Sequence, residues 1–362
     1  MSLRILLTHV YAWPEVRRGG ERYLHEVSAG LAAAGHEVRI VSTARRAHRA
    51  RIDDVEVMNV RRRHFWKSRF GNLSDEVAFG AQALARLATK RFDVWHALGT
   101  ADAAAASLVA SVRKGTSVYT DLGISAKSWR AQRRDRRLYD IVVRKVDRYI
   151  CLSESAARSV ENDYGRDTRV LGGGVNVDAF APATSRNRAP ALLFTSDLTE
   201  PRKNFPLLLE AFALVRERRP DAELWIAGPG DPEQALRAAP ARARDGVVLV
   251  GVGALSDLPA LYGKAWATVL PSSGEAFGLV VLESLACGTP VVTLDDAGPA
   301  ELVQPGIGVK AAASPESLAA ACDEALDLAR DPQIVERCRA AAEPHDWRRG
   351  VIPRLEKIYS DS

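Results

Sequence analysis

Two glutamates stand eight positions apart near residue 280, and this spacing can serve one elongated ligand. Glu275 precedes the segment Gly278–Cys287, whose apolar residues predict a helix, and Glu283 lies within it. A carboxylate accepts two hydroxyl donors through strong charge-assisted hydrogen bonds, so the pair can hold hydroxyl groups at two points of one molecule. Alternatively, Glu275 only complements the positive end of the helix, and Glu283 is an exposed helical residue.

The loop that leads into this helix predicts a binding site for a diphosphate. The first backbone N–H groups of a helix lack intrahelical partners and lie at the positive end of the helix dipole, so they bind anions. Gly278, which has no side chain, allows a ligand to approach this backbone closely.

Apolar strands alternate with helices along the whole chain, which predicts an α/β protein with parallel sheets. The strands expected in the first half are Arg4–Val10, Glu37–Ser42, Val55–Val60, Val94–Ala97, Ser117–Thr120, Arg148–Cys151 and Thr168–Leu171, with a helix at Glu21–Ala34. The second half predicts strands at Ala191–Thr195, Glu223–Ala227, Val247–Val250, Ala267–Leu270 and Pro290–Thr293. Its expected helices are Phe205–Arg218, Leu258–Tyr262, Gly278–Cys287 and Pro315–Ala329.

Residues 181–190 have the Pro-, Ser- and Asn-containing composition of a linker. We therefore expect a first doubly wound domain at 1–180 and a second at 191–344, with a C-terminal helix at 345–362 packing back on the first. Ligands bind at the carboxyl ends of the strands in such sheets, so two facing domains predict a central cleft.

Composition excludes several classes of protein. The 362 residues include four cysteines without a C-x-x-C pair, so neither a disulfide framework nor a zinc site is expected, and a cytoplasmic location fits. The first apolar run is short and lacks a cleavage site, so it predicts a strand, and no run is long enough to span a membrane. No D-x-D pair occurs, so no metal is expected at a diphosphate.

The net charge of +5 is concentrated in two basic stretches, Arg61–Arg69 and Lys127–Arg148. These are either solvated surfaces or surfaces that attract anionic lipid or a phosphorylated acceptor. Nucleic-acid binding is not expected, because the aromatic residues follow no RNA-binding signature.

Several motifs, in order along nearly the whole chain, resemble the retaining glycosyltransferases of family 4, which have the GT-B fold of two Rossmann-like domains. The pair Glu275 and Glu283 matches the E-x7-E pattern of that family. The further motifs are Arg18–Arg22, Leu31–Ser42, Asp147–Ser155, Gly173–Phe180, Leu258–Tyr262 and Phe277–Leu279, together with the Cys287–Val292 segment and Trp347.

The resemblance implies a role for each matching position. Glu275 would contact hydroxyls of the donor sugar, Glu283 would bind the ribose diol, and Lys203 would neutralise the diphosphate. Other substrate-binding positions would be the backbone of Ala276, Phe277, Gly278 and Leu279 for sugar and diphosphate, Gly19 and Gly20 as a cap on the phosphate from the opposite domain, and Val252 near the base.

The chain departs from the family at two positions. Asp197 stands where the family carries a phosphate-binding arginine, and Arg202 is our candidate for the missing cation. Leu122 stands where a T-x-H motif places its histidine. Asp121 and His96 are the polar candidates near that position, although a histidine at a strand end is about as often structural as functional.

We therefore expect a metal-independent hexosyltransferase that moves a sugar from a nucleoside diphosphate, such as UDP or GDP, to an acceptor hydroxyl. The acceptor would be a small molecule, a glycan or a lipid-linked group, with peripheral contact at an anionic membrane surface as one explanation of the basic stretches. No cofactor is expected beyond the nucleotide sugar as co-substrate. The alternatives are an epimerase or phosphorylase-like enzyme of the same fold, and a catalytically weak protein that binds sugar nucleotides.

Overall fold

The computed structural model describes residues 2–16, 18–62, 73–87, 91–123, 133–228, 230–238, 241–251 and 255–361. The chain divides into two compact units, one formed by residues 1–173 with 347–362 and the other by residues 174–346. The change from the first unit to the second therefore falls just before the expected linker at 181–190. The chain returns to the first unit at Trp347.

The first unit contains an eight-stranded sheet in the order β3-β4-β2-β1-β5-β6-β7-β8. Its strands are β1 (Arg4–Thr8), β2 (Glu37–Ala44), β3 (His48–Ile52), β4 (Val55–Arg61), β5 (Val94–Ala97), β6 (Thr116–Asp121), β7 (Arg148–Cys151) and β8 (Arg169–Val170). Only β3 runs antiparallel to its neighbour, β4. The sequence did not predict β3, because its residues are mostly polar and exposed. Asp53 and Asp54, both with positive φ, form the tight turn that makes the hairpin.

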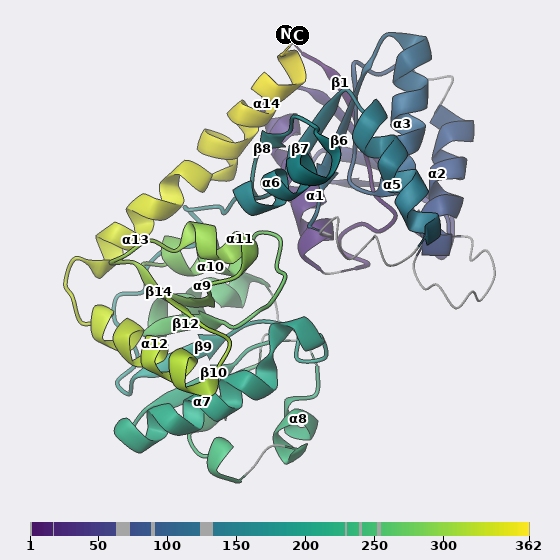
Figure 1. The fold of residues 1–362 in the computed structure, drawn as a ribbon. Helices are drawn as coiled ribbons and strands as arrows, with labels where there is room; N and C mark the ends of the chain where they lie inside the picture. The colour runs from purple at the N-terminus through teal and green to yellow at the C-terminus, as the bar shows by residue number, and fades with distance from the viewer. Residues whose placement is uncertain are drawn as a thin grey trace. The chain divides into compact units, whose positions relative to one another are not determined.

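Helices of the first unit cover this sheet (Figure 1). They are α1 (Gly19–Ala33), α2 (Leu73–Leu87), α3 (Thr100–Arg113), α5 (Arg133–Lys145), α6 (Glu154–Tyr164) and α14 (Ile352–Ser360). Leu6, Val41 and Trp95 of the sheet pack with buried residues of α2 and α3. The basic stretch from Lys127 onward contains α5, whose buried face includes Tyr139, Val142 and Val143. Within the described ranges, no helix combines the length and apolar composition needed to cross a bilayer.

The C-terminal segment completes the core of the first unit. The ring of Trp347 meets that of Tyr23 in α1 edge-on, with centroids 5.6 Å apart. Gly30 of α1 lies so close to Ile352 that an added Cβ would fall 2.6 Å from its side chain. Tyr359 Oη lies 2.7 Å from Nδ1 of the fully buried His96 in β5. Residues 347–361 are therefore packed against this unit.

The second unit contains a parallel six-stranded sheet in the order β11-β10-β9-β12-β13-β14. Its strands are β9 (Ala191–Phe194), β10 (Glu223–Ile226), β11 (Val247–Leu249), β12 (Ala267–Leu270), β13 (Val291–Leu294) and β14 (Gly308–Ala311). The order reverses between β9 and β12, and ligands of such sheets bind beyond the carboxyl ends of the strands at the point of reversal. The sequence did not predict the edge strand β14, which is short and carries the polar Lys310.

The helices of the second unit follow its strands in turn. They are α7 (Phe205–Arg218), α8 (Pro232–Ala238), α9 (Leu258–Lys264), α10 (Leu279–Ala286), α11 (Ala297–Leu302), α12 (Pro315–Leu328) and α13 (Ile334–Ala342). The buried faces of α7 and α12 share one apolar cluster with the strands, including Phe194, Ile226 and Val269. This core fixes the strand ends from which the functional loops leave.

Tyr359→Phe tests how the C-terminal helix is anchored. The change leaves one nitrogen of the buried His96 ring without its hydrogen-bond partner, so we expect the free energy of unfolding to fall by about 1–3 kcal/mol. Chemical denaturation monitored by circular dichroism measures this fall. Lys357→Ala, an exposed change on the same helix, is the control and should cost much less. Equal effects of the two variants would contradict the anchoring role.

Candidate functional site

An ion pair joins two residues that the sequence separates by 72 positions. Lys203 Nζ lies 2.5 Å from Glu275 Oε2. Lys203 ends the short turn Pro201–Lys203 after β9, and Glu275 lies in the loop after β12, so the pair stands where the strand order reverses. The two side chains are 15% and 21% exposed, which shields their attraction from water and still leaves them accessible to a ligand.

The turn that carries Lys203 is bonded to the loop that carries Glu275. Asn204 adopts a left-handed conformation, with φ of 49°, and ends the turn. Its side-chain amide donates to the carbonyl of Pro271 and to Ser273 Oγ, both at 2.8 Å. The backbone N–H of Ser273 donates in return to the carbonyl of Arg202, at 2.9 Å. These bonds keep the ammonium and the carboxylate together.

A second set of contacts holds the same loop from the side of α11. Asp296 Oδ2 accepts a hydrogen bond of 2.9 Å from the N–H of Gly274. Gly298 donates its N–H to the carbonyl of Glu275 at 3.2 Å. A Cβ on Gly298 would fall 2.0 Å from the carbonyl oxygen of Ala276, so only glycine fits there. The sequence analysis missed Asn204, Asp296 and Gly298, whose effect depends on contacts between distant segments.

The loop ends at the first turn of α10, as predicted. Gly278 has a φ of 87°, in the region that favours glycine, and no side chain caps the helix. Phe277 is buried beside the ring of His345, with centroids 6.1 Å apart. The first N–H groups of α10, at Leu279 and Val280, are therefore uncapped by any described side chain. Such a helix start suits an anionic ligand.

Glu283 is buried, and this excludes the alternative that it is an exposed helical residue. Glu283 is only 3% exposed. Glu283 Oε2 accepts a hydrogen bond of 2.7 Å from the hydroxyl of Tyr262, and that hydroxyl lies 3.0 Å from Thr195 Oγ1. Tyr262 therefore orients the carboxylate. The sequence placed Tyr262 in a family motif and assigned it no role.

Arg202 and Asp197 lie beside the loop and make local contacts. Arg202 is about half exposed, with Nε 3.2 Å from Glu200 and Nη1 3.3 Å from the carbonyl of Gly274. Asp197 Oδ1 accepts from the N–H and the hydroxyl of Thr199, at 2.8 and 2.7 Å. The aspartate at the position of the family arginine thus stabilises a turn, and Arg202 stays a candidate cation.

In the first unit, the two predicted glycines begin helix α1. A Cβ added to Gly19 would meet no heavy atom within 4 Å. A Cβ added to Gly20 would fall 2.9 Å from Leu122 Cδ1. Leu122 stands where the family carries its histidine. The start of α1 and the end of β6 therefore meet at this leucine.

The structure places His96 and Asp121, which the sequence predicted as substrate-binding residues, in hydrogen bonds within the fold. His96 is fully buried, and both ring nitrogens have partners, Tyr359 on one side and Thr120 Oγ1 at 2.7 Å on the other. Burial lowers the pKa of His96 to about 3, so the ring stays neutral. Asp121 Oδ2 accepts from two buried hydroxyls, those of Tyr139 and Tyr149, at 2.8 and 2.7 Å. Both side chains therefore stabilise the core around β6.

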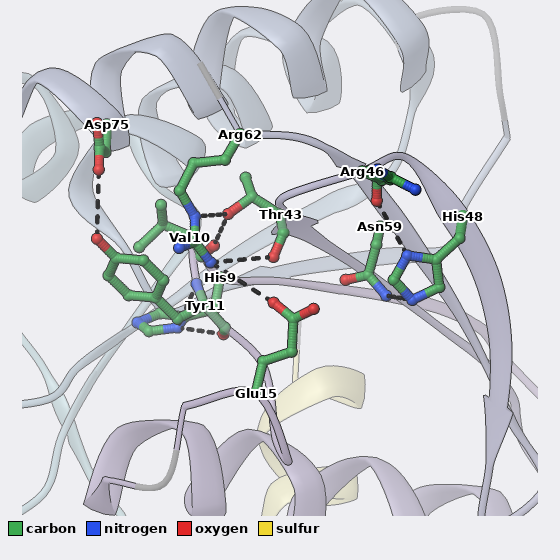
Figure 2. A network of polar contacts seen from close by, with 10 residues as sticks. All are labelled: His9, Val10, Tyr11, Glu15, Thr43, Arg46, His48, Asn59, Arg62 and Asp75. Atoms are coloured by element: carbon green, nitrogen blue, oxygen red, sulfur yellow. Dashed lines mark hydrogen bonds and ion pairs between the residues drawn. The ribbon is translucent and has the colours of Figure 1, made fainter. Parts of the chain in front are cut away.

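A polar network lies at the carboxyl edge of β1, β2 and β4 (Figure 2). Arg62 Nε donates to Thr43 Oγ1 at 3.1 Å, and its guanidinium stands 4.8 Å above the ring of Tyr11. Glu15 lies 3.7 Å from the same guanidinium. This member of the basic stretch Arg61–Arg69 is thus engaged within the fold. Val252, residues 63–69 and residues 127–132 lie outside the described residues.

Comparison with solved structures confirms the predicted fold class. The Anabaena protein HepE, solved in complex with UDP and glucose, matches with a TM-score of 0.76 at 17% sequence identity, over 99% of this chain and 100% of that one. The chain has the GT-B fold of the glycosyltransferases.

Comparison of sequences then gives the family. The family model described as Glycosyltransferase Family 4 matches residues 17–179, and the model described as Glycosyl transferases group 1 matches residues 189–328. The chain belongs to this family of glycosyltransferases, as the motifs indicated.

Two curated relatives illustrate the range of the family. The phosphatidyl-myo-inositol mannosyltransferase of Propionibacterium freudenreichii is 30% identical over 235 residues, 62% of this chain and 58% of that protein. The glycogen synthase of Mycobacterium tuberculosis is 29% identical over 395 residues, 99% of this chain and 94% of that protein. The match thus spans little more than half the length of the mannosyltransferase.

Gly298→Ala tests the loop geometry without changing any ionisable group. The added methyl group must displace the loop at Ala276, so we expect affinity for a nucleoside diphosphate to fall roughly tenfold or more, about 1.4 kcal/mol. Isothermal titration calorimetry measures the affinity. Glu301→Ala, an exposed change on the same helix, should leave it unchanged. Wild-type affinity in Gly298→Ala would contradict this account of the loop.

Proposed function

We propose that this protein is a retaining glycosyltransferase that uses a nucleoside-diphosphate sugar as donor. The observation that carries the proposal is the pairing of Lys203 with Glu275 beside the uncapped start of α10. A cation, a carboxylate and free backbone N–H groups stand there within one loop system. This set matches the needs of a diphosphate joined to a hydroxyl-rich sugar.

Breaking the anomeric C–O bond leaves negative charge on the departing nucleoside diphosphate. Lys203, together with the first N–H groups of α10, would stabilise this charge, and preorganised groups of this kind lower a barrier strongly. Glu275 would accept hydrogen bonds from sugar hydroxyls while it positions Lys203. Glu283, oriented by Tyr262, would accept hydrogen bonds from the ribose diol. Retention of the anomeric configuration is the chemistry that the family resemblance implies.

The relatives support a nucleotide donor and a hydroxyl acceptor. HepE, which shares the fold, was solved with UDP and glucose. Names among the relatives include a phosphatidyl-myo-inositol mannosyltransferase and a D-inositol 3-phosphate glycosyltransferase. We propose an acceptor that carries a phosphate or a lipid, which would explain the basic composition of the first unit.

The donor test begins with a thermal-shift screen of nucleoside diphosphates and their sugars, because a ligand of the folded state raises the apparent melting temperature.

With the best donor, Glu275→Gln should lower kcat/KM by roughly 10²-fold or more, because it weakens both the sugar contact and the hold on Lys203. Glu283→Gln should mainly raise the donor KM, by about tenfold. Release of the nucleoside diphosphate measures turnover.

Glu210→Gln, an exposed change on α7, is the matched control and should keep full activity. Unchanged donor affinity and turnover in both Glu275→Gln and Glu283→Gln would contradict the proposal. Binding of nucleotides without turnover would favour a catalytically weak binding protein. Release of free sugar that no acceptor can capture would favour epimerase-like chemistry.

Two helices of the first unit carry the side chains that support our proposal of contact with an anionic membrane. Leu108 and Val112 of α3 are 56% and 74% exposed, and Ile141 of α5 is 50% exposed. These two helices pack side by side (Figure 1). Exposed basic residues on them include Arg113, Arg137, Arg144 and Lys145. Exposed apolar side chains among basic ones are the composition that binds at the surface of anionic lipid.

Co-sedimentation with phosphatidylglycerol vesicles tests this surface. Wild-type protein should bind, and binding should weaken as salt rises, because salt screens charge attraction. A variant with Val112→Ser, Arg137→Glu and Arg144→Glu should lose roughly tenfold or more in affinity, at about 1 kcal/mol for each basic residue. The control replaces Val248 and Leu249, exposed apolar residues of the second unit, with Ser. Equal binding by the two variants would contradict a membrane role for α3 and α5.

A further inference from the structure

Three side chains of the second unit, Thr195, Tyr262 and Glu283, form a hydrogen-bonded relay. Tyr262 Oη donates to Glu283 Oε2 at 2.7 Å, and Thr195 Oγ1 lies 3.0 Å from the same tyrosine oxygen. Thr195 directly follows β9, one of the two strands between which the order of this sheet reverses. Tyr262 lies in α9 and Glu283 in α10, so the relay connects a strand end at the expected ligand edge with two helices.

The carboxylate sets the direction of both hydrogen bonds in the relay. An ionised carboxylate only accepts, so the single hydroxyl hydrogen of Tyr262 goes to Glu283. The oxygen of Tyr262 is then left as an acceptor, and the hydroxyl of Thr195 must donate to it. Each donor in such a series polarises the next, which strengthens the bond to the carboxylate.

Packing and a backbone hydrogen bond hold Tyr262 in place. Its side chain is fully buried, and its ring centroid lies 6.1 Å from that of Phe180. Thr289 Oγ1 donates to the carbonyl oxygen of Tyr262 at 2.8 Å. The terminal torsion of a glutamate has broad minima, so a fixed donor at Oε2 is what restricts the carboxylate of Glu283 to one orientation.

We propose that Thr195 and Tyr262 are positioning residues that make the nucleotide site selective for ribose over 2′-deoxyribose. The inference rests on the proposed function, in which Glu283 accepts hydrogen bonds from the ribose diol. A carboxylate already held in one orientation binds a ribose hydroxyl without a further ordering cost. A 2′-deoxyribose leaves this buried charged acceptor one donor short, and polar sites reject a ligand strongly on that ground.

Affinities for a nucleoside diphosphate and for its 2′-deoxy analogue test the relay. The probes are UDP with 2′-deoxy-UDP, or GDP with 2′-deoxy-GDP, as the thermal-shift screen decides, and isothermal titration calorimetry of the full-length protein measures both affinities. Wild type should bind the ribose form roughly tenfold or more tightly, the effect of one hydrogen bond to a charged group. Tyr262→Phe should reduce this preference to about twofold, because it mainly weakens binding of the form that carries the 2′-hydroxyl.

Thr195→Val removes the outer donor of the relay and should reduce the preference about threefold, through a weaker bond between Tyr262 and Glu283. Thr195→Ser keeps the hydroxyl and should restore the wild-type preference. Thr195 is partly exposed, so these changes disturb the core less than a change at Tyr262. Tyr164→Phe on α6 of the first unit is the matched control and should leave both affinities unchanged.

The outcomes separate this inference from the function on which it rests. A wild-type ratio of the two affinities in both Tyr262→Phe and Thr195→Val overturns the relay, and the glycosyltransferase proposal stands if wild type still releases a nucleoside diphosphate from a sugar nucleotide. An equal loss of affinity for both probes indicates a merely structural role and overturns the relay as well. Wild-type protein that binds no nucleoside diphosphate overturns both proposals.

Discussion

The attraction between Lys203 and Glu275 is the interaction on which the candidate site depends. It connects the loops after β9 and β12, the strands between which the order of the second sheet reverses. Unlike charges separated by 2.5 Å in a partly shielded site attract strongly, and neighbouring hydrogen bonds through Asn204 and Asp296 fix their geometry. The uncapped start of α10 lies a few residues further along the same loop. One ion pair thus holds the groups that would meet a diphosphate sugar.

The sequence predicted the fold well where strands are apolar and buried, as in β1, β9 and β12. It missed β3, whose polar residues form an exposed hairpin, and it treated the region of α5 only as a basic stretch. It predicted Glu275, Glu283 and Lys203 as site residues, but it could not show that Lys203 and Glu275 touch or that Tyr262 orients Glu283. Such contacts depend on how distant loops pack, which residue types and local spacing do not encode.

The first unit separates its polar residues into a buried set and an accessible set. Both ring nitrogens of His96 and one carboxylate oxygen of Asp121 have partners inside the core. His9 is less deeply buried, and its Nδ1 contacts both the carbonyl and the N–H of Tyr11. The distinction depends on burial and on partners, and residue type alone could not supply it.

The most direct test of this account is a crystal structure of the full-length protein with the nucleoside diphosphate that stabilises it most. We expect the diphosphate within hydrogen-bonding distance of the first N–H groups of α10 and of Lys203, with the ribose on Glu283. A nucleotide bound elsewhere on the second unit, with the Lys203–Glu275 pair undisturbed and distant, would contradict the central claim.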